Sequence, residues 1–80
     1  GIEMPDDTQA LKLEPSPDLD RAVVEYDKEK DILVYDVEIL IQCYVERGLT
    51  EEEAWDWYSY NTVRTGYYVK NYPRFVYEEN

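Results

Sequence analysis

The sequence predicts a small α+β domain in which a three-stranded antiparallel sheet is packed by two helices, in the order β-β-α-α-β. Three observations indicate this fold class. Short β-branched and aromatic runs flank an acidic turn near residue 29, as in a hairpin. Two stretches with apolar residues at helical spacing follow them. A last short apolar alternation near the carboxyl end predicts the third strand.

One domain is the most that eighty residues are expected to form. Residues 1–20 are predicted to be a flexible, disordered acidic tail, because they hold three of the four prolines and six acids against one base. Residues 21–80 are then the single domain. An alternative stays open, in which the tail docks on its own domain or on a partner through apolar residues, namely Leu11, Leu13 and Leu19.

The first two strands are expected at residues 22–27 and 32–35, joined by the turn at 27–31. The acids of this region occupy four positions of a calcium-binding loop, namely Asp27, Glu29, Asp31 and Glu38. Ile32, however, stands where such a loop needs glycine. We therefore favour a solvated acidic turn and expect no metal and no cofactor, although a looser cation site at the turn stays open.

The first helix is predicted to follow Asp36, which is a suitable N-cap, and to end at Gly48. Four apolar residues share its inner face: Val37, Leu40, Ile41 and Tyr44. Ile39 and Cys43 are expected to form a second, smaller apolar strip on the side that faces water.

The second helix is predicted to begin after Thr50, because Thr50 and Glu53 match a capping box. Five residues are expected on its inner stripe: Ala54, Trp57, Tyr58, Asn61 and Thr65. Asn61 would then be a buried polar residue that bonds a neighbouring segment. Trp55 is expected at the flank, and Tyr60 and Val63 near the outer face. Gly66 is expected to end the helix, and residues 74–77 to form the last strand.

The residues that most often carry catalysis are missing. The chain has no histidine, and Ser16 and Ser59 lie in no nucleophile motif. Cys43 has no histidine to activate it, so a packed or interfacial thiol is favoured. The three glycines are scattered and form no phosphate-binding loop. We therefore predict that the protein is not an enzyme and has no catalytic residue.

The charge of the chain indicates what it binds. A net charge of −11 attracts basic partners and opposes direct binding to nucleic acid. No apolar run is long enough to span a membrane and no signal peptide is visible, so no membrane association is expected. One cysteine fits a reducing cytoplasm.

Residues 24–77 resemble small uncharacterised proteins of bacteriophages and prophages. The features that carry the resemblance are YDKEKDILVYD, an apolar helix that ends in ERGLTEEEA, an aromatic helix that contains YN, a glycine, and a closing PRFVY. The resemblance implies a phage-derived protein that acts in the cytoplasm of a bacterial host. It implies no activity and no catalytic residue.

Two functional hypotheses follow. In the first, the protein is an acidic protein–protein interaction module, a phage inhibitor of a host or defence protein with a basic nucleic-acid-binding groove. Its contact residues would be Glu51, Glu52, Asp56, Trp55 and Tyr60, although a solvated helix start explains these acids equally well.

In the second hypothesis the protein is a structural homo-oligomer, in the simplest case a homodimer, because surplus apolar surface often marks an interface. Its self-interface would consist of Ile39, Cys43, Trp55, Val63, Tyr67 and Tyr68.

Overall fold

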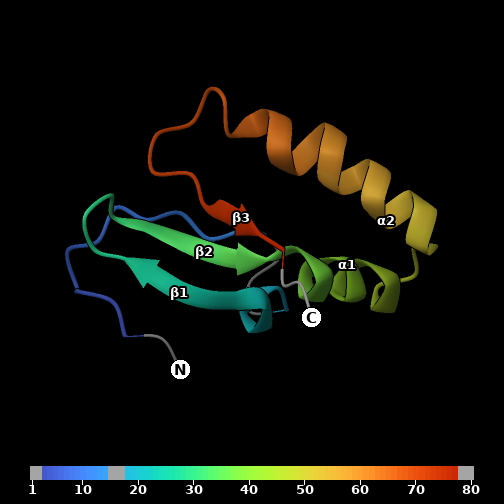
Figure 1. The fold of residues 1–80 in the computed structure, drawn as a ribbon, viewed down its shortest axis with the longest axis horizontal. Helices are drawn as coiled ribbons and strands as arrows, with labels where there is room; N and C mark the ends of the chain where they lie inside the picture. Colours follow the sequence, from blue (N-terminus) through green and yellow to red (C-terminus); the bar gives the residue numbers. More distant parts are fainter. Residues whose placement is uncertain (1–2, 15–17, 78–80) are drawn as a thin grey trace.

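The computed structural model describes residues 3–14 and 18–77, and it confirms the α+β class and the order β-β-α-α-β (Figure 1). Two short segments accompany the main elements: η1, a 3₁₀ turn, and η2, a π-helical segment that continues α2. The elements in order are η1 (Asp20–Ala22), β1 (Val23–Asp27), β2 (Ile32–Asp36), α1 (Val37–Glu46), α2 (Glu51–Trp57), η2 (Tyr58–Val63) and β3 (Arg74–Val76).

The sheet is mixed, with strand order β1-β2-β3. β1 and β2 form the predicted antiparallel hairpin, but β3 runs parallel to β2, so the expectation of a wholly antiparallel sheet is wrong at its last strand. A parallel pair needs a crossover of a dozen residues or more. α1 and α2 provide this crossover, which brings the chain back to β3 beside β2 (Figure 1).

β2 is the central strand, and both of its faces are covered. Leu33 and Tyr35 point into the core. There the centroid of the Tyr35 ring lies 6.1 Å from that of the Phe75 ring on β3. Val34 faces the other way and is 1% exposed. Its neighbours in register are Glu25 and Arg74, whose ion pair of 3.6 Å lies across β2. Coverage on both faces explains why nearly the whole strand is apolar.

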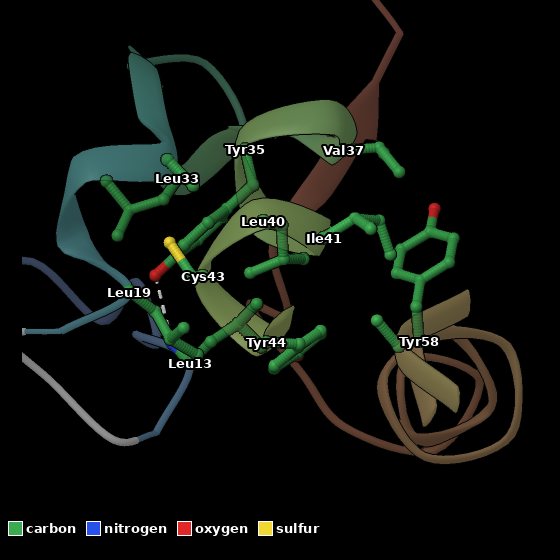
Figure 2. Close-up of a cluster of buried hydrophobic side chains, with 12 residues drawn as sticks. Leu13, Leu19, Leu33, Tyr35, Val37, Leu40, Ile41, Cys43, Tyr44 and Tyr58 are labelled. Carbon is green, nitrogen blue, oxygen red and sulfur yellow. Dashed lines mark hydrogen bonds between the residues drawn. The ribbon is translucent and has the colours of Figure 1, made fainter. Parts of the chain in front are cut away.

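The hydrophobic core brings together the inner face of the sheet, α1, α2 and the N-terminal segment (Figure 2). On the sheet side it contains Leu33 and Tyr35. Its other largest members are Leu13, Leu19, Val37, Leu40, Ile41, Tyr44 and Tyr58. The predicted inner face of the first helix is therefore confirmed.

The N-terminal segment is docked on the domain over the residues that the structure describes. Leu19 is fully buried and Leu13 is 7% exposed. The backbone N–H of Leu13 donates to the Tyr35 hydroxyl at 2.9 Å, and that of Leu11 donates to the Asn71 carbonyl at 3.2 Å. The prediction of a disordered tail is wrong for these residues, and the domain does not begin at residue 21. Residues 1–2, 15–17 and 78–80 lie outside the described part of the chain.

Asp31 holds the N-terminal segment against the hairpin. Its carboxylate accepts hydrogen bonds from the Thr8 hydroxyl, from the Gln9 N–H at 2.8 Å and from the Tyr26 hydroxyl at 2.5 Å. The Asn71 side-chain amide donates to the Asp31 carbonyl at 2.9 Å. The carboxylate that the sequence assigned to a solvated acidic turn therefore serves as a structural tie. Among the described residues, no cluster of three or more Asp, Glu, Cys or His side chains is placed to hold a metal ion.

Acid is expected to weaken this tie. The hydrogen bonds from Thr8, Tyr26 and Gln9 lower the pKa of Asp31 below its ordinary value near 3.8. A carboxyl with a lowered folded pKa stabilises the fold above its unfolded pKa, and this stabilisation is lost as pH falls through the folded pKa. In urea unfolding at pH 7 and pH 3, we expect Asp31→Asn to reduce the pH dependence of the free energy of unfolding. Asp6→Asn, which removes an exposed carboxyl nearby, is the control. Equal pH dependence in the wild type and Asp31→Asn would contradict the assignment.

α1 has the predicted ends, but its outer side is not free. The Asp36 carboxylate accepts from the Ile39 N–H at 3.1 Å, and Gly48 follows the helix with φ +111°. Cys43 is buried and Ile39 is half-buried. The expectation that Ile39 and Cys43 face water is wrong, because residues 18–22, which include η1, pack on this side of α1.

α2 begins with the predicted capping box. The Thr50 hydroxyl accepts from the Glu53 N–H at 3.1 Å, and the Glu53 carboxylate accepts from the Thr50 N–H at 2.9 Å. The backbone bond lowers the pKa of Glu53, because it favours the charged carboxylate. Thr50 and Glu53 thus have the structural role that the sequence predicts.

The inner stripe of the second helix differs from the prediction. Ala54 and Tyr58 are buried as predicted, but Trp57 is 50% exposed and Asn61 is exposed. Thr62 takes the inner position instead, and its hydroxyl lies 3.0 Å from the buried Tyr44 hydroxyl. The π-helical turn of η2 explains the exchange of Asn61 for Thr62, because bonding from residue i to i+5 winds more residues into each turn and rotates the later side chains. Trp57 precedes this turn, which therefore does not explain its exposure.

Candidate interaction surface

The helical pair presents one sign of charge. α1, α2 and η2 contain no Lys or Arg, and all of their acidic residues are exposed: Glu38, Glu46, Glu51, Glu52, Glu53 and Asp56. Three of these lie in the first turn of α2, where the positive end of the helix dipole stabilises them. These exposed acids give the helical pair an excess of negative charge, whatever the local reason for each of them.

A groove of about 400 Å³ lies between α1 and α2. Its floor is apolar, since Ile41 is buried and Trp55 is half-buried, while Val45 is 41% exposed at the edge. Among the described residues its lining is Glu38, Ile41, Gln42, Val45, Glu46, Glu51 and Trp55. Acids at both ends of α1 and at the start of α2 therefore surround an apolar floor.

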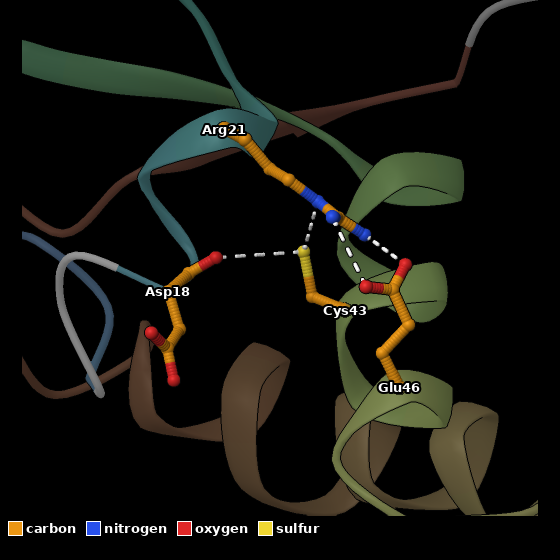
Figure 3. Close-up of polar contacts among 4 residues, drawn as sticks. All are labelled: Asp18, Arg21, Cys43 and Glu46. Carbon is orange, nitrogen blue, oxygen red and sulfur yellow. Dashed lines mark hydrogen bonds and ion pairs between the residues drawn. The ribbon is translucent and has the colours of Figure 1, made fainter.

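Most of the surrounding carboxylates are available to a partner. Glu46 is the exception, because both of its oxygens accept hydrogen bonds from Arg21, which lower its pKa (Figure 3). In the described part of the chain, no ion pair involves the other exposed acids of this surface, which are Glu38, Glu51, Glu52, Glu53 and Asp56. A cationic partner would thus meet carboxylates that have no competing base.

The residues predicted to make contact fall on two neighbouring faces of the second helix. Glu51 and Trp55 line the groove. Glu52, Asp56 and Tyr60 follow one another at intervals of four on the outer face, and Tyr60 is 66% exposed. The structure therefore places two of the predicted contact residues at the groove and the other three on the exposed outer face of the same helix.

Trp55 is held at the groove by contacts with two other aromatic rings. Its ring stacks on that of Tyr77 with centroids 6.4 Å apart and planes at 8°. It also meets the Tyr58 ring edge-on at 5.9 Å. Burial is the main cause that raises the pKa of Tyr58. An aromatic side chain fixed in this way loses little conformational freedom when a partner covers it.

The α1 side of the groove was missed from the sequence. Glu38, Gln42 and Val45 lie on the same helical face as Ile41, at intervals of three and four residues. That spacing is visible in the sequence. What is not visible is that α2 packs close enough to turn this face into one wall of a groove.

Figure 3 shows how the segment with η1 is tied to α1. Besides its pair with Glu46, Arg21 donates from Nε to the Cys43 sulfur at 3.2 Å, and the Cys43 thiol donates to the Asp18 carbonyl at 3.8 Å. Arg47 pairs with the Asp18 carboxylate at 2.6 Å. These ion pairs are about half-exposed, so each contributes modestly, and Cys43 is a packed thiol.

The predicted self-interface is only partly accessible. Cys43 is 3% exposed, so its assignment to a contact with a second copy is wrong. Ile39 and Val63 are half-buried. Tyr67 and Tyr68 are 78% and 87% exposed, and their contact with a second copy stays a prediction.

No protein-family model, curated protein or solved structure matches the chain. Within the described residues, none of the helices has the length and apolar character needed to cross a membrane.

Proposed function

We propose that the protein is a non-catalytic, acidic protein–protein interaction module, which inhibits a host or defence protein by occupying a basic groove that otherwise holds nucleic acid. The observation that carries this proposal is the α1–α2 surface, where exposed acids surround an apolar groove and, among the described residues, only one of them, Glu46, is paired with a base. Opposite charges speed the encounter with a basic partner and align the two surfaces.

Aromatic side chains at the same surface also support this proposal. Trp55 lies at the groove, and Trp57 and Tyr60 are 50% and 66% exposed on the same helical segment. Trp and Tyr are enriched among the residues that contribute most to protein–protein affinity. Charge then provides attraction and competition with nucleic acid, while the rings provide contact area.

The phage-derived origin and the bacterial host belong to the same proposal. They follow from the resemblance of residues 24–77 to small phage and prophage proteins. A phage protein of this kind would meet its target in the cytoplasm of the infected cell.

A matched pull-down from bacterial lysate tests the proposal. We expect wild-type protein to capture a nucleic-acid-binding protein at low salt and to lose it when salt or duplex DNA is added, because the contact is electrostatic. A variant with Glu51→Lys, Glu52→Lys and Asp56→Lys is expected to weaken this binding at least about tenfold when measured with the purified partner.

The control variant changes the net charge by the same amount, but in the N-terminal segment and not on the α1–α2 surface. Glu3→Lys, Asp6→Lys and Asp7→Lys alter three exposed acids of the N-terminal segment. This control variant is expected to bind like wild type, and circular dichroism is used to check that both variants are folded. Equal binding by both variants would refute the assignment to the α1–α2 surface, whether both bind as wild type does or both fail to bind.

A further inference from the structure

A second cavity, of about 470 Å³, has the opposite charge from the rest of the molecule. It is lined mainly by residues of the β1–β2 turn, of β3 and of the segment 66–73, which connects the second helix to β3. Figure 1 shows where these elements lie. Lys30 and Lys70 both line it, and no acidic residue among the described ones does, although 19 of the 80 residues are acidic. Such segregation in a chain of net charge −11 distinguishes this cavity from the α1–α2 groove.

The two lysines are brought together by the backbone. Lys30 precedes Asp31 and Lys70 precedes Asn71, and these following residues both adopt left-handed conformations, with φ of +55° and +60°. The Asn71 amide joins the two turns through its 2.9 Å bond to the Asp31 carbonyl. In the part of the chain that the structure describes, neither lysine forms an ion pair. Two like charges at one cavity repel each other, and a bound anion would lessen that repulsion.

The walls of the cavity are aromatic and apolar. The Tyr72 ring is half-buried and meets the Phe75 ring at 62° with centroids 6.2 Å apart. Gly66 allows this placement, because a Cβ atom at this residue would lie 2.7 Å from the Tyr72 ring. Tyr67, 78% exposed, stands at the entrance. These walls suit a flat, apolar body.

We propose that this cavity binds a small organic anion in which a carboxylate or phosphate is attached to a planar ring. Lys30 and Lys70 contact the anionic group, and Tyr72 and Phe75 contact the ring. The volume falls within the range of about 300–1,000 Å³ that is usual for small-molecule sites. The site shares no residue with the α1–α2 surface. A negative result for one proposal therefore leaves the other unaffected.

Titration of the full chain, followed by two-dimensional ¹H–¹⁵N spectra, tests the site with four probes. Phenyl phosphate and benzoate carry both ring and charge, inorganic phosphate carries charge alone, and benzyl alcohol carries the ring alone. We expect shifts confined to residues 30–32 and 66–75, and at least about tenfold tighter binding for one of the two ring anions than for either half probe. Which ring anion binds more tightly identifies the anionic group. Equal binding of a half probe, or no binding of either ring anion at millimolar concentration, would overturn the proposal.

Single substitutions test whether Lys30 and Lys70 contact the anionic group of the ligand. Lys30→Gln and Lys70→Gln are each expected to weaken binding of the preferred ring anion about five- to tenfold. Lys28→Gln is the matched control, because Lys28 is exposed in the same turn but does not line this cavity. The three lysines are exposed, so the variants are expected to fold. Loss of affinity in the control as large as in the other two variants would show general attraction to charge and would overturn the site.

Discussion

Replacing Leu19 with alanine is expected to lower the free energy of unfolding by about 2–5 kcal/mol. Leu19 is fully buried and belongs to the main core. Its truncation leaves a cavity next to residues from α1 and the sheet, and the surrounding structure relaxes only in part. A domain of this size is stabilised by roughly 5–10 kcal/mol, so the loss would be a large fraction of the total. Urea unfolding followed by tryptophan fluorescence measures it.

The control lies in the same segment. Leu11 is 40% exposed, so Leu11→Ala is expected to cost less than about 1 kcal/mol. The pair of variants separates a docked segment from a flexible tail, because a flexible tail predicts little effect from either substitution. A Leu19→Ala variant as stable as wild type would contradict the docked arrangement.

Gly66→Ala is expected to destabilise the fold by about 1–3 kcal/mol. Helix propensity alone would favour alanine by as much as about 1 kcal/mol, but the new methyl group would lie 2.7 Å from the Tyr72 ring and 3.3 Å from the Val63 carbonyl. The ring is confined by its contact with Phe75, so the clash outweighs the propensity.

A double-mutant cycle identifies the cause of that loss. In a Tyr72→Leu background the ring that meets the new methyl group is gone, so Gly66→Ala is expected to cost at least about 1 kcal/mol less than in the wild type. The free energies come from urea unfolding of the four proteins. The same cost in both backgrounds would show that the backbone, and not the Tyr72 ring, requires glycine here.

Features whose causes lie within a few residues could be predicted from the amino-acid sequence alone. The capping box of Thr50 and Glu53, the N-cap at Asp36 and the helix end at Gly48 all depend on bonds or dihedral angles within one turn. The hairpin and the inner face of α1 follow from the period of the apolar residues. The acids and aromatic residues of the candidate surface were predicted from their positions on one helix, and their contact with a partner stays a prediction.

Features that depend on partners far away in the sequence could be known only from the folded chain. Leu19 is core because residues 18–21 are tied to α1, more than twenty positions away, and this contact also buries Cys43. The direction of β3 depends on the path of the whole α1–α2 crossover. The π turn that exchanges Asn61 for Thr62 brings the Thr62 hydroxyl to that of Tyr44.

Both cavities belong to this second group. The α1–α2 groove and the site of Lys30 and Lys70 each combine side chains from separate elements. Residues far apart in the sequence meet only when the loops between them close, and the free energy for closing them comes from burial of the whole core. A local sequence pattern does not show which distant residues the core brings together. The residues that line each cavity could therefore be known only from the folded chain.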